Sequence, residues 1–143
     1  MRFAEAQTTW TRWFNFHSKA HQQKRYPATW DWYKEQTKPI YLREPDSEVP
    51  ASQGFPLEAL QRHFGSESFF AGTVAFLIAF AIYEGFERIE LWGIEAKADS
   101  EHGFERPCIA YWVGRARQAG IDVFFPDGVT ICKVDKLYGY ETT

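Results

Sequence analysis

The sequence contains little cysteine, and its two thiols lie far apart. Cys108 and Cys132 are the only cysteines among 143 residues, and no CxxC pair occurs. A structural zinc site takes several cysteine or histidine ligands at short spacing, so the sequence argues against one. Reducing compartments keep thiols unpaired. A sequence with only two cysteines therefore favours a cytoplasmic location.

The sequence also lacks an excess of positive charge and a long apolar segment. Its 16 Lys and Arg residues against 19 Asp and Glu residues give a net charge of -3, whereas general nucleic-acid binding requires a basic face. The run VAFLIAFAI at residues 74–82 is apolar throughout, but a membrane-spanning helix needs about 20 such residues. We therefore expect no general nucleic-acid binding, no membrane partner, and a fully buried helix at this run.

Aromatic residues, by contrast, are abundant. They make up 18% of the chain, as 13 Phe, 7 Tyr and 6 Trp. Two interpretations are open: the rings form a thick core, or some of them line a ligand site or a subunit contact, where large rings contribute most.

The order of predicted elements indicates an α/β fold. Strands are predicted at residues 11–17, 39–43, 88–92 and 121–125, and helices from Pro27, from Pro56, over residues 70–83 and from Pro107. Residues 18–25 are predicted as a polar connection and residues 44–54 as a loop. This alternation is typical of a parallel sheet covered on both faces, so we expect one Rossmann-like domain over residues 1–143, a small three-layer sandwich with a mainly parallel sheet.

Helical spacing also predicts which side chains are buried. In the helix from Pro107, an apolar stripe runs through Ile109, Trp112, Val113 and Ala116. Arg115 and Arg117 are expected to point outward. Gly85 and Gly120 follow the last two predicted helices, where a left-handed residue commonly ends a helix.

The start of the buried helix is the first candidate ligand site. Small residues at Ser66, Ser68, Gly72 and Thr73 precede or begin it. They would leave backbone N–H groups open at a helix N-terminus, where anions bind. The alternative is ordinary capping by Ser or Thr together with tight packing at Gly72.

The loop WGIEAKADSEHGFERP, residues 92–107, is the second candidate. Ligands of open parallel sheets bind beyond the carboxyl ends of the strands, and Glu95 follows a predicted strand directly. Arg106 stands at a helix start and could hold a carboxylate or phosphate, and Glu105 beside it could supply acid, base or anion contacts. The alternative is a solvated charged loop whose ion pairs contribute about 0–1 kcal/mol each.

His17 is the third candidate, because it ends the first predicted strand at the same kind of edge. It could act as a base or hydrogen-bond a phosphate, or simply bond to a neighbouring loop. A metal site from Asp99, Glu101, His102 and Glu105 matches no known ligand spacing, so no metal is predicted. Cys108 opens a helix without an identifiable base, which argues against a cysteine nucleophile.

Several segments resemble a group of uncharacterised phage and prophage Rossmann-like proteins. They are RWFNFHS, TKPIYL, AIYEG, the strand ending in GIE, RP before a helix, and GIDVFFP after it. The strand–helix–strand core is more distantly similar to the MptE-like pterin diphosphokinase domain and to bacterial sialyltransferases that use a cytidine-nucleotide sugar donor. The resemblance implies a nucleotide-type ligand, with donor contacts at the start of the buried helix, and the host cytoplasm if the chain is phage-encoded.

One departure from longer relatives affects the expected function. They begin with a strand and a Gly-rich turn of the type GxGPS, which would cradle a phosphate, and this sequence has no such turn. An absent first strand leaves a sheet edge to be covered, so we expect a homo-oligomer.

The sequence therefore favours binding of a nucleotide or other phosphorylated small molecule, without strong catalysis and without a further cofactor. Two alternatives stay open. One is a non-catalytic phage accessory protein that binds a host protein, sequesters a signalling nucleotide or acts in virion assembly. The other is a degenerate nucleotide-sugar or diphospho transferase.

Overall fold

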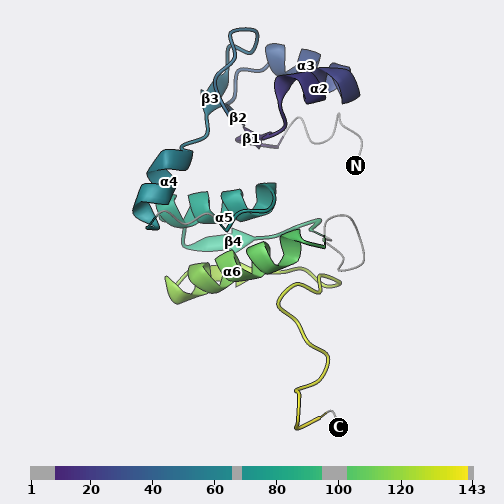
Figure 1. The fold of residues 1–143 in the computed structure, drawn as a ribbon, viewed down its shortest axis with the longest axis vertical. Coiled ribbons are helices and arrows are strands. Elements are labelled where there is room, and N and C mark those ends of the chain that lie inside the picture. Colours follow the sequence, from purple (N-terminus) through teal and green to yellow (C-terminus); the bar gives the residue numbers. More distant parts are fainter. Residues whose placement is uncertain (1–8, 66–68, 95–102, 142–143) are drawn as a thin grey trace. The chain divides into compact units, whose positions relative to one another are not determined.

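The computed structural model describes residues 9–65, 69–94 and 103–141. Its internal contacts divide the chain into two compact units, Met1–Leu57 and Glu58–Thr143. The described residues form helices and parallel strands in two small sheets, one in each unit (Figure 1). A small α/β fold with parallel strands is therefore confirmed, while a single Rossmann-like domain stays a prediction.

From residue 9 onward, the first unit forms a three-stranded parallel sheet and two helices. Its strands are β1 (Trp13–Phe14), β2 (Ile40–Leu42) and β3 (Ser52–Gly54), paired in that order. Two consecutive helices, α2 (Lys19–Arg25) and α3 (Pro27–Lys34), connect β1 to β2. The predicted strands at residues 11–17 and 39–43, and the helix from Pro27, are confirmed in shorter form.

Helix α2 corrects the prediction of a polar connection at residues 18–25. Ser18 caps this helix, since its Oγ accepts a hydrogen bond from the His21 backbone N–H at 3.2 Å. The helix has no apolar stripe, and its buried residue is Gln22, whose side chain accepts a bond from Asn15 Nδ2 at 2.8 Å. Helix α2 packs through this polar contact, and its sequence lacks the hydrophobic periodicity from which a helix could have been predicted.

Strand β3 corrects part of the loop predicted at residues 44–54. It pairs with β2 through the register Ile40↔Ser52 to Leu42↔Gly54. The Ile40 N–H donates to the Ala51 carbonyl at 3.1 Å, and the Phe55 N–H donates to the Leu42 carbonyl at 2.8 Å. A strand of Ser, Gln and Gly lacks apolar alternation; it is formed by backbone pairing with β2 and by hydrogen bonds between Ser52 Oγ and the Asp46 backbone.

Aromatic rings make up much of the core of the first unit. Trp30, Tyr33, Ile40, Leu42 and Val49 are buried, and Trp10, Trp13 and Trp32 pack against them. The Trp13 and Trp32 rings meet edge to face at 5.0 Å, and those of Trp10 and Trp32 at 5.6 Å, which is a favourable geometry for aromatic pairs. In this unit the aromatic-core interpretation is confirmed.

The described residues of the second unit form two parallel strands and three helices. Helix α4 (Leu57–His63) starts at the boundary of the units and is followed by α5 (Thr73–Glu84) and β4 (Arg88–Glu90). Helix α6 (Glu105–Gln118) then leads to β5 (Asp122–Phe124), which pairs in parallel with β4. The predicted strands at residues 88–92 and 121–125 are confirmed in shorter form.

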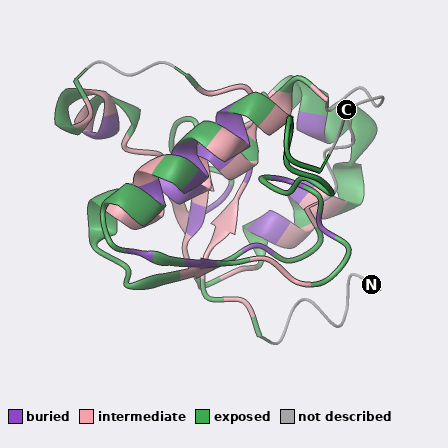
Figure 2. Ribbon diagram, turned by 90° about the horizontal axis from the view of Figure 1, so that it is seen from below, coloured by how far each residue is buried: buried purple, intermediate pink, exposed green. Residues whose placement is uncertain are grey.

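The core of the second unit lies where α5 and α6 pack. The predicted stripe on α6 is confirmed, since Ile109, Trp112, Val113 and Ala116 are all at most 1% exposed. Figure 2 shows buried and exposed residues on different sides of this helix. Helix α5 is only partly buried, through Ala75, Ile78, Ala79 and Phe80, so the expectation of a fully buried helix is wrong.

The helix ends follow the predicted glycines, but two helix starts differ. Gly85 and Gly120 adopt the left-handed conformation, with φ of 79° and 84°. Helix α5 begins at Thr73 rather than residue 70, and α6 begins at Glu105 rather than Pro107. Proline is tolerated throughout the first helical turn, because the N–H groups there have no partner within the helix.

Within the described residues, no helix combines the length and the hydrophobicity that a membrane crossing would require.

Candidate ligand site at the β4–β5 edge

A cavity lies beyond the carboxyl ends of β4 and β5. Its volume is about 500 Å³, and Gly93, Ile94 and residues 126–130 line it. We call it the edge cavity. Strand β4 ends just before Gly93, and β5 ends just before residues 126–130. This is the edge at which parallel α/β sheets bind ligands, and the volume falls in the usual range of about 300–1,000 Å³ for ligand pockets.

Both long helices of the second unit begin at this edge. Helix α5 ends close to the start of β4, so the beginning of α5 lies toward the other end of that strand (Figure 1). Helix α6 follows β4 and starts at Glu105. Because a helix N-terminus carries a partial positive charge, the two helices together favour a negative group at this edge.

Arg106 joins the start of α6 to the edge cavity. Its Nη1 donates to Thr130 Oγ1 and its Nη2 donates to the Thr130 carbonyl oxygen, both at 3.1 Å. Thr130 lines the cavity. The guanidinium is therefore oriented at the rim by a two-point contact, which pre-positions a planar group suited to carboxylate or phosphate.

Glu105 occupies the N-terminus of α5 at which the sequence predicts an anion. A Cβ built on Gly72 would lie 2.7 Å from Glu105 Cδ and 2.8 Å from Glu105 Oε2, so the carboxylate rests against Gly72, the N-cap of α5. Gly72 has extended backbone geometry, so close packing rather than backbone strain explains the glycine. The contact fits the tight-packing part of the alternative for Gly72, whereas capping by a Ser or Thr side chain is not found, because the N-cap is Gly72 itself.

The structure thus brings several predicted residues together from separate segments. Gly72 and Thr73 at α5, and Glu105 and Arg106 at α6, all lie at the edge of the β4–β5 pair. Glu95, Ser66 and Ser68 lie outside the residues that the structure describes, as do Asp99, Glu101 and His102. Within residues 9–65, 69–94 and 103–141, no group of three or more His, Cys, Asp and Glu side chains could hold a metal ion.

His17 belongs to a different cavity, in the first unit. Together with residues 18, 19, 30 and 42–46 it lines a space of about 180 Å³ beyond the carboxyl ends of β1 and β2, which we call the first-unit cavity. The His17 backbone N–H donates to Asn15 Oδ1 at 2.9 Å, and its ring stacks on that of His21 at 4.7 Å. This local hydrogen bond fits the alternative that His17 simply bonds to a neighbouring loop, although the donor is the His17 backbone N–H and not its ring.

Lys19 is a charged residue of this cavity that the sequence patterns missed. Its Nζ lies 2.9 Å from both Asp46 Oδ2 and Glu48 Oε1, and 5.3 Å from the centre of the Trp30 ring. These hydrogen bonds lower the pKa of both carboxyl groups, and the bonds to Glu48 and Asp46 raise the pKa of Lys19. Lys19 directly follows Ser18, a residue type that commonly caps helices. This sequence signal could have placed Lys19 at a helix start.

The cysteines offer no activated nucleophile. Cys108 is buried on the first turn of α6. Loss of hydration raises the pKa of its thiol, and the nearby Glu105 charge adds to this, against a hydrogen bond with the Ala71 backbone that lowers it. Loss of hydration likewise raises the pKa of Cys132, against the influence of Arg117 and Arg106. Because the thiolate is the nucleophile, the raised pKa values disfavour the reactive form of both thiols.

No protein-family model, curated protein or solved structure matches this chain. The candidate function therefore depends on the geometry and chemistry of the site itself.

Proposed function

We propose that the protein binds a nucleotide or other phosphorylated small molecule in the edge cavity. The observation that carries the proposal is the position of Arg106, fixed by Thr130 at the rim of a cavity of about 500 Å³ beyond two parallel strands. The phosphate is expected at this guanidinium, because charge-assisted, bidentate hydrogen bonds are stronger than hydrogen bonds between neutral groups. The remainder of the ligand would lie over Ile94 and Val129.

The backbone around the cavity supports close approach by a ligand. Gly93 and Gly128 adopt the left-handed conformation, with φ of 69° and 87°, and a Cβ at either would meet no atom within 4 Å. Turns with alternating handedness present backbone N–H groups that bind anions. These two glycines keep the approach to the cavity open from both strand ends.

Glu105 sets the charge balance of the proposed site. Its carboxylate lies against Gly72, the N-cap of α5, where the positive helix end attracts it and where it repels a second anion. A phosphate therefore binds on the Arg106 side, and removing the Glu105 charge should strengthen its binding. The two adjacent residues are expected to affect affinity in opposite directions.

The lining favours binding over catalysis. Among the described residues that line the cavity, Asp127 is the one with an ionisable side chain. General acid–base chemistry commonly needs two groups with different pKa values. Binding without turnover would suit a protein that sequesters a nucleotide.

A thermal-shift screen against nucleotides, nucleotide sugars and cyclic nucleotides tests the proposal, with the corresponding nucleosides as phosphate-free controls. A ligand at 100 times its Kd adds about 2.7 kcal/mol to the free energy of unfolding, which raises Tm by several degrees. The affinity of the best ligand is then measured calorimetrically for three variants. Arg106→Ala should weaken it roughly 10- to 100-fold, as expected for charge-assisted bonds of about 1.5–3 kcal/mol.

Two variants serve as comparisons. Glu105→Gln should bind the same ligand more tightly than wild type. Arg62→Ala changes net charge as Arg106→Ala does, but on the exposed last turn of α4, and should leave affinity unchanged. Absence of stabilisation by every phosphorylated compound, or equal losses in the Arg62 and Arg106 variants, would contradict the proposal.

A further inference from the structure

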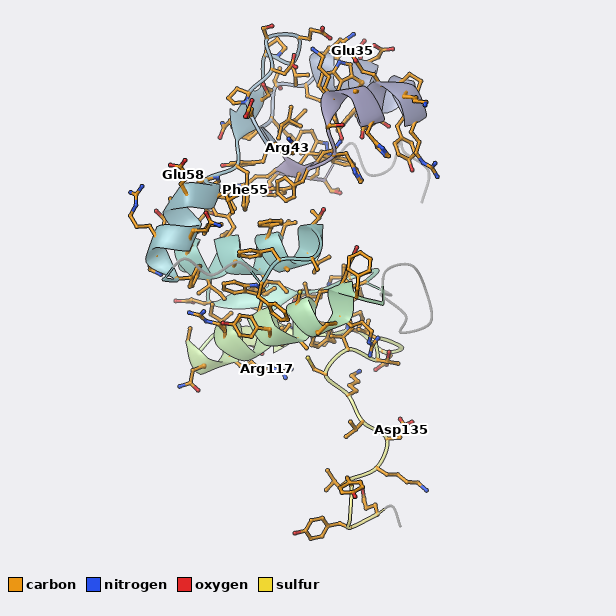
Figure 3. The ribbon with its side chains drawn as sticks, viewed as in Figure 1. Glu35, Arg43, Phe55, Glu58, Arg117 and Asp135 are labelled. Atoms are coloured by element: carbon orange, nitrogen blue, oxygen red, sulfur yellow. The ribbon has the colours of Figure 1, made fainter. Side chains whose placement is uncertain are left out.

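The segment after β5 carries large apolar side chains that its own unit does not cover. Residues 133–141, which we call the C-terminal arm, include Val134, Leu137, Tyr138 and Tyr140, with exposed fractions of 76%, 58%, 94% and 92%. Figure 3 labels Asp135 on this segment and shows the segment leading away from the helices and strands of the second unit. Single exposed apolar residues are ordinary, but a contiguous group marks an interaction surface.

The arm ends in a formed turn. The N–H groups of Tyr140 and Glu141 donate to the Leu137 carbonyl at 3.3 and 2.9 Å, and the Leu137 N–H donates to Glu141 Oε2 at 2.8 Å. These bonds fix the backbone that presents Tyr138 and Tyr140. A turn already closed before binding loses less conformational entropy on docking.

A groove of matching character lies at the C-terminal half of α6. It has a volume of about 500 Å³, and we call it the α6 groove; its lining residues are His63, Phe64, Ile82, Tyr111, Gly114, Arg115, Gln118 and Ala119. Gly114 stands in the middle of a helix, yet a Cβ there would meet no atom within 4 Å. The groove is therefore open above Gly114, where a larger side chain would project into it.

Arg115 gives the groove a surface suited to aromatic rings. Its guanidinium lies 5.0 Å from the Phe64 ring centre, 5.2 Å from that of Trp112 and 5.8 Å from that of Tyr111. It folds back over these rings instead of pointing outward as predicted, whereas Arg117 is exposed. Arginine on aromatic rings is a typical receptor for further tyrosines at interfaces, and its charge complements the Glu141 carboxylate of the arm.

We propose that the C-terminal arm of one copy docks in the α6 groove of a second copy, and that the exchange is reciprocal. In a two-fold exchange each arm is covered by a groove and each groove is filled by an arm, so the assembly closes as a dimer. Each tyrosine buries about 150–250 Å². With the groove surfaces they cover, two arms reach roughly the 1,200–2,000 Å² of a specific interface. The described arm does not fill its own groove, since both tyrosines are more than nine-tenths exposed.

Light scattering after size exclusion, over a wide concentration series, tests the exchange. Wild type should have the mass of a dimer. Tyr138→Ser/Tyr140→Ser, in which both changes are on exposed side chains, should raise the dimer Kd roughly tenfold or more, as truncation of tyrosine anchors does. Gly114→Trp should do the same by filling the groove, while Gly114→Ala, the matched control, should stay dimeric.

Mixing the two defective variants gives the sharpest outcome. The Tyr138→Ser/Tyr140→Ser chain keeps an open groove and the Gly114→Trp chain keeps an intact arm, so together they should restore one exchanged contact and a heterodimer. A wild-type monomer at all concentrations would overturn the proposal, and would point to docking within one chain or to another protein as the arm's partner. Dimers that persist in both variants would place the interface elsewhere.

Discussion

At the scale of the residue, Tyr33 organises the polar interior of the first unit. Its side chain is 1% exposed, and its hydroxyl oxygen accepts hydrogen bonds from Trp13 Nε1 and Asn15 Nδ2, both at 2.9 Å. Asn15 in turn donates to Gln22 of α2. One hydroxyl thus links β1 and α2 to the aromatic core. Burial raises the pKa of Tyr33, against the opposing effect of these two hydrogen bonds.

Tyr33→Phe should destabilise the protein by about 1–3 kcal/mol, because the hydrogen bonds from Trp13 and Asn15 to the buried hydroxyl are lost. The variant should also lose part of the alkaline dependence of stability. A raised folded-state pKa means that the wild-type hydroxyl contributes fully below its ordinary value near 10 and loses that contribution as pH rises toward the folded-state value. Urea unfolding at neutral and alkaline pH measures both effects; equal stability of the two proteins at neutral pH would refute this assignment.

At the scale of the element, helix α2 depends on side chains rather than on an apolar stripe. Lys19, on its first turn, binds Asp46 and Glu48 in the connection between β2 and β3, and Trp30 Nε1 of α3 donates to Glu48 Oε2 at 3.1 Å. The carboxylates therefore tie two helices to a loop. This network is exposed, and its contribution should be sensitive to salt.

Lys19→Gln should shift acid unfolding to higher pH. Asp46 and Glu48 have lowered pKa values in the folded state, so they stabilise the fold above their ordinary values near 4 and lose that effect as pH falls through the folded values. Without Lys19 this stabilisation is reduced. Circular dichroism during acid titration measures the midpoint, and Lys24→Gln on the same helix is the matched control. Equal midpoints for Lys19→Gln and wild type would count against the network.

Elements with strong periodicity could be predicted from the sequence, and elements without it could not. The α6 stripe through Trp112 was predictable because its spacing is helical, and so were the glycine ends at Gly85 and Gly120. Helix α2 and strand β3 could not be, since a capping serine, a buried Gln22 and backbone pairing form them. Local hydrogen bonds carry no hydrophobic pattern.

At the scale of the whole molecule, the candidate residues separate into two places. Sequence proximity and the strand-edge rule suggested one ligand edge, and Gly72, Thr73, Glu105 and Arg106 do meet at the β4–β5 pair. His17 lies in the first unit, at the edge of a separate sheet. Strand partners are set by long-range pairing, so the sequence could not tell which strands share a sheet.

The central claim is that a phosphorylated ligand occupies the edge cavity, and mapping of amide chemical shifts during ligand titration tests it most directly. The account predicts that saturating ligand shifts the amide signals of Gly93, Gly128 and Thr130, which line that cavity. The Arg106→Ala variant should show these shifts only at higher ligand concentration. Shifts gathered instead at His17, Lys19 and Arg43 of the first-unit cavity, with the edge cavity unchanged, would contradict it.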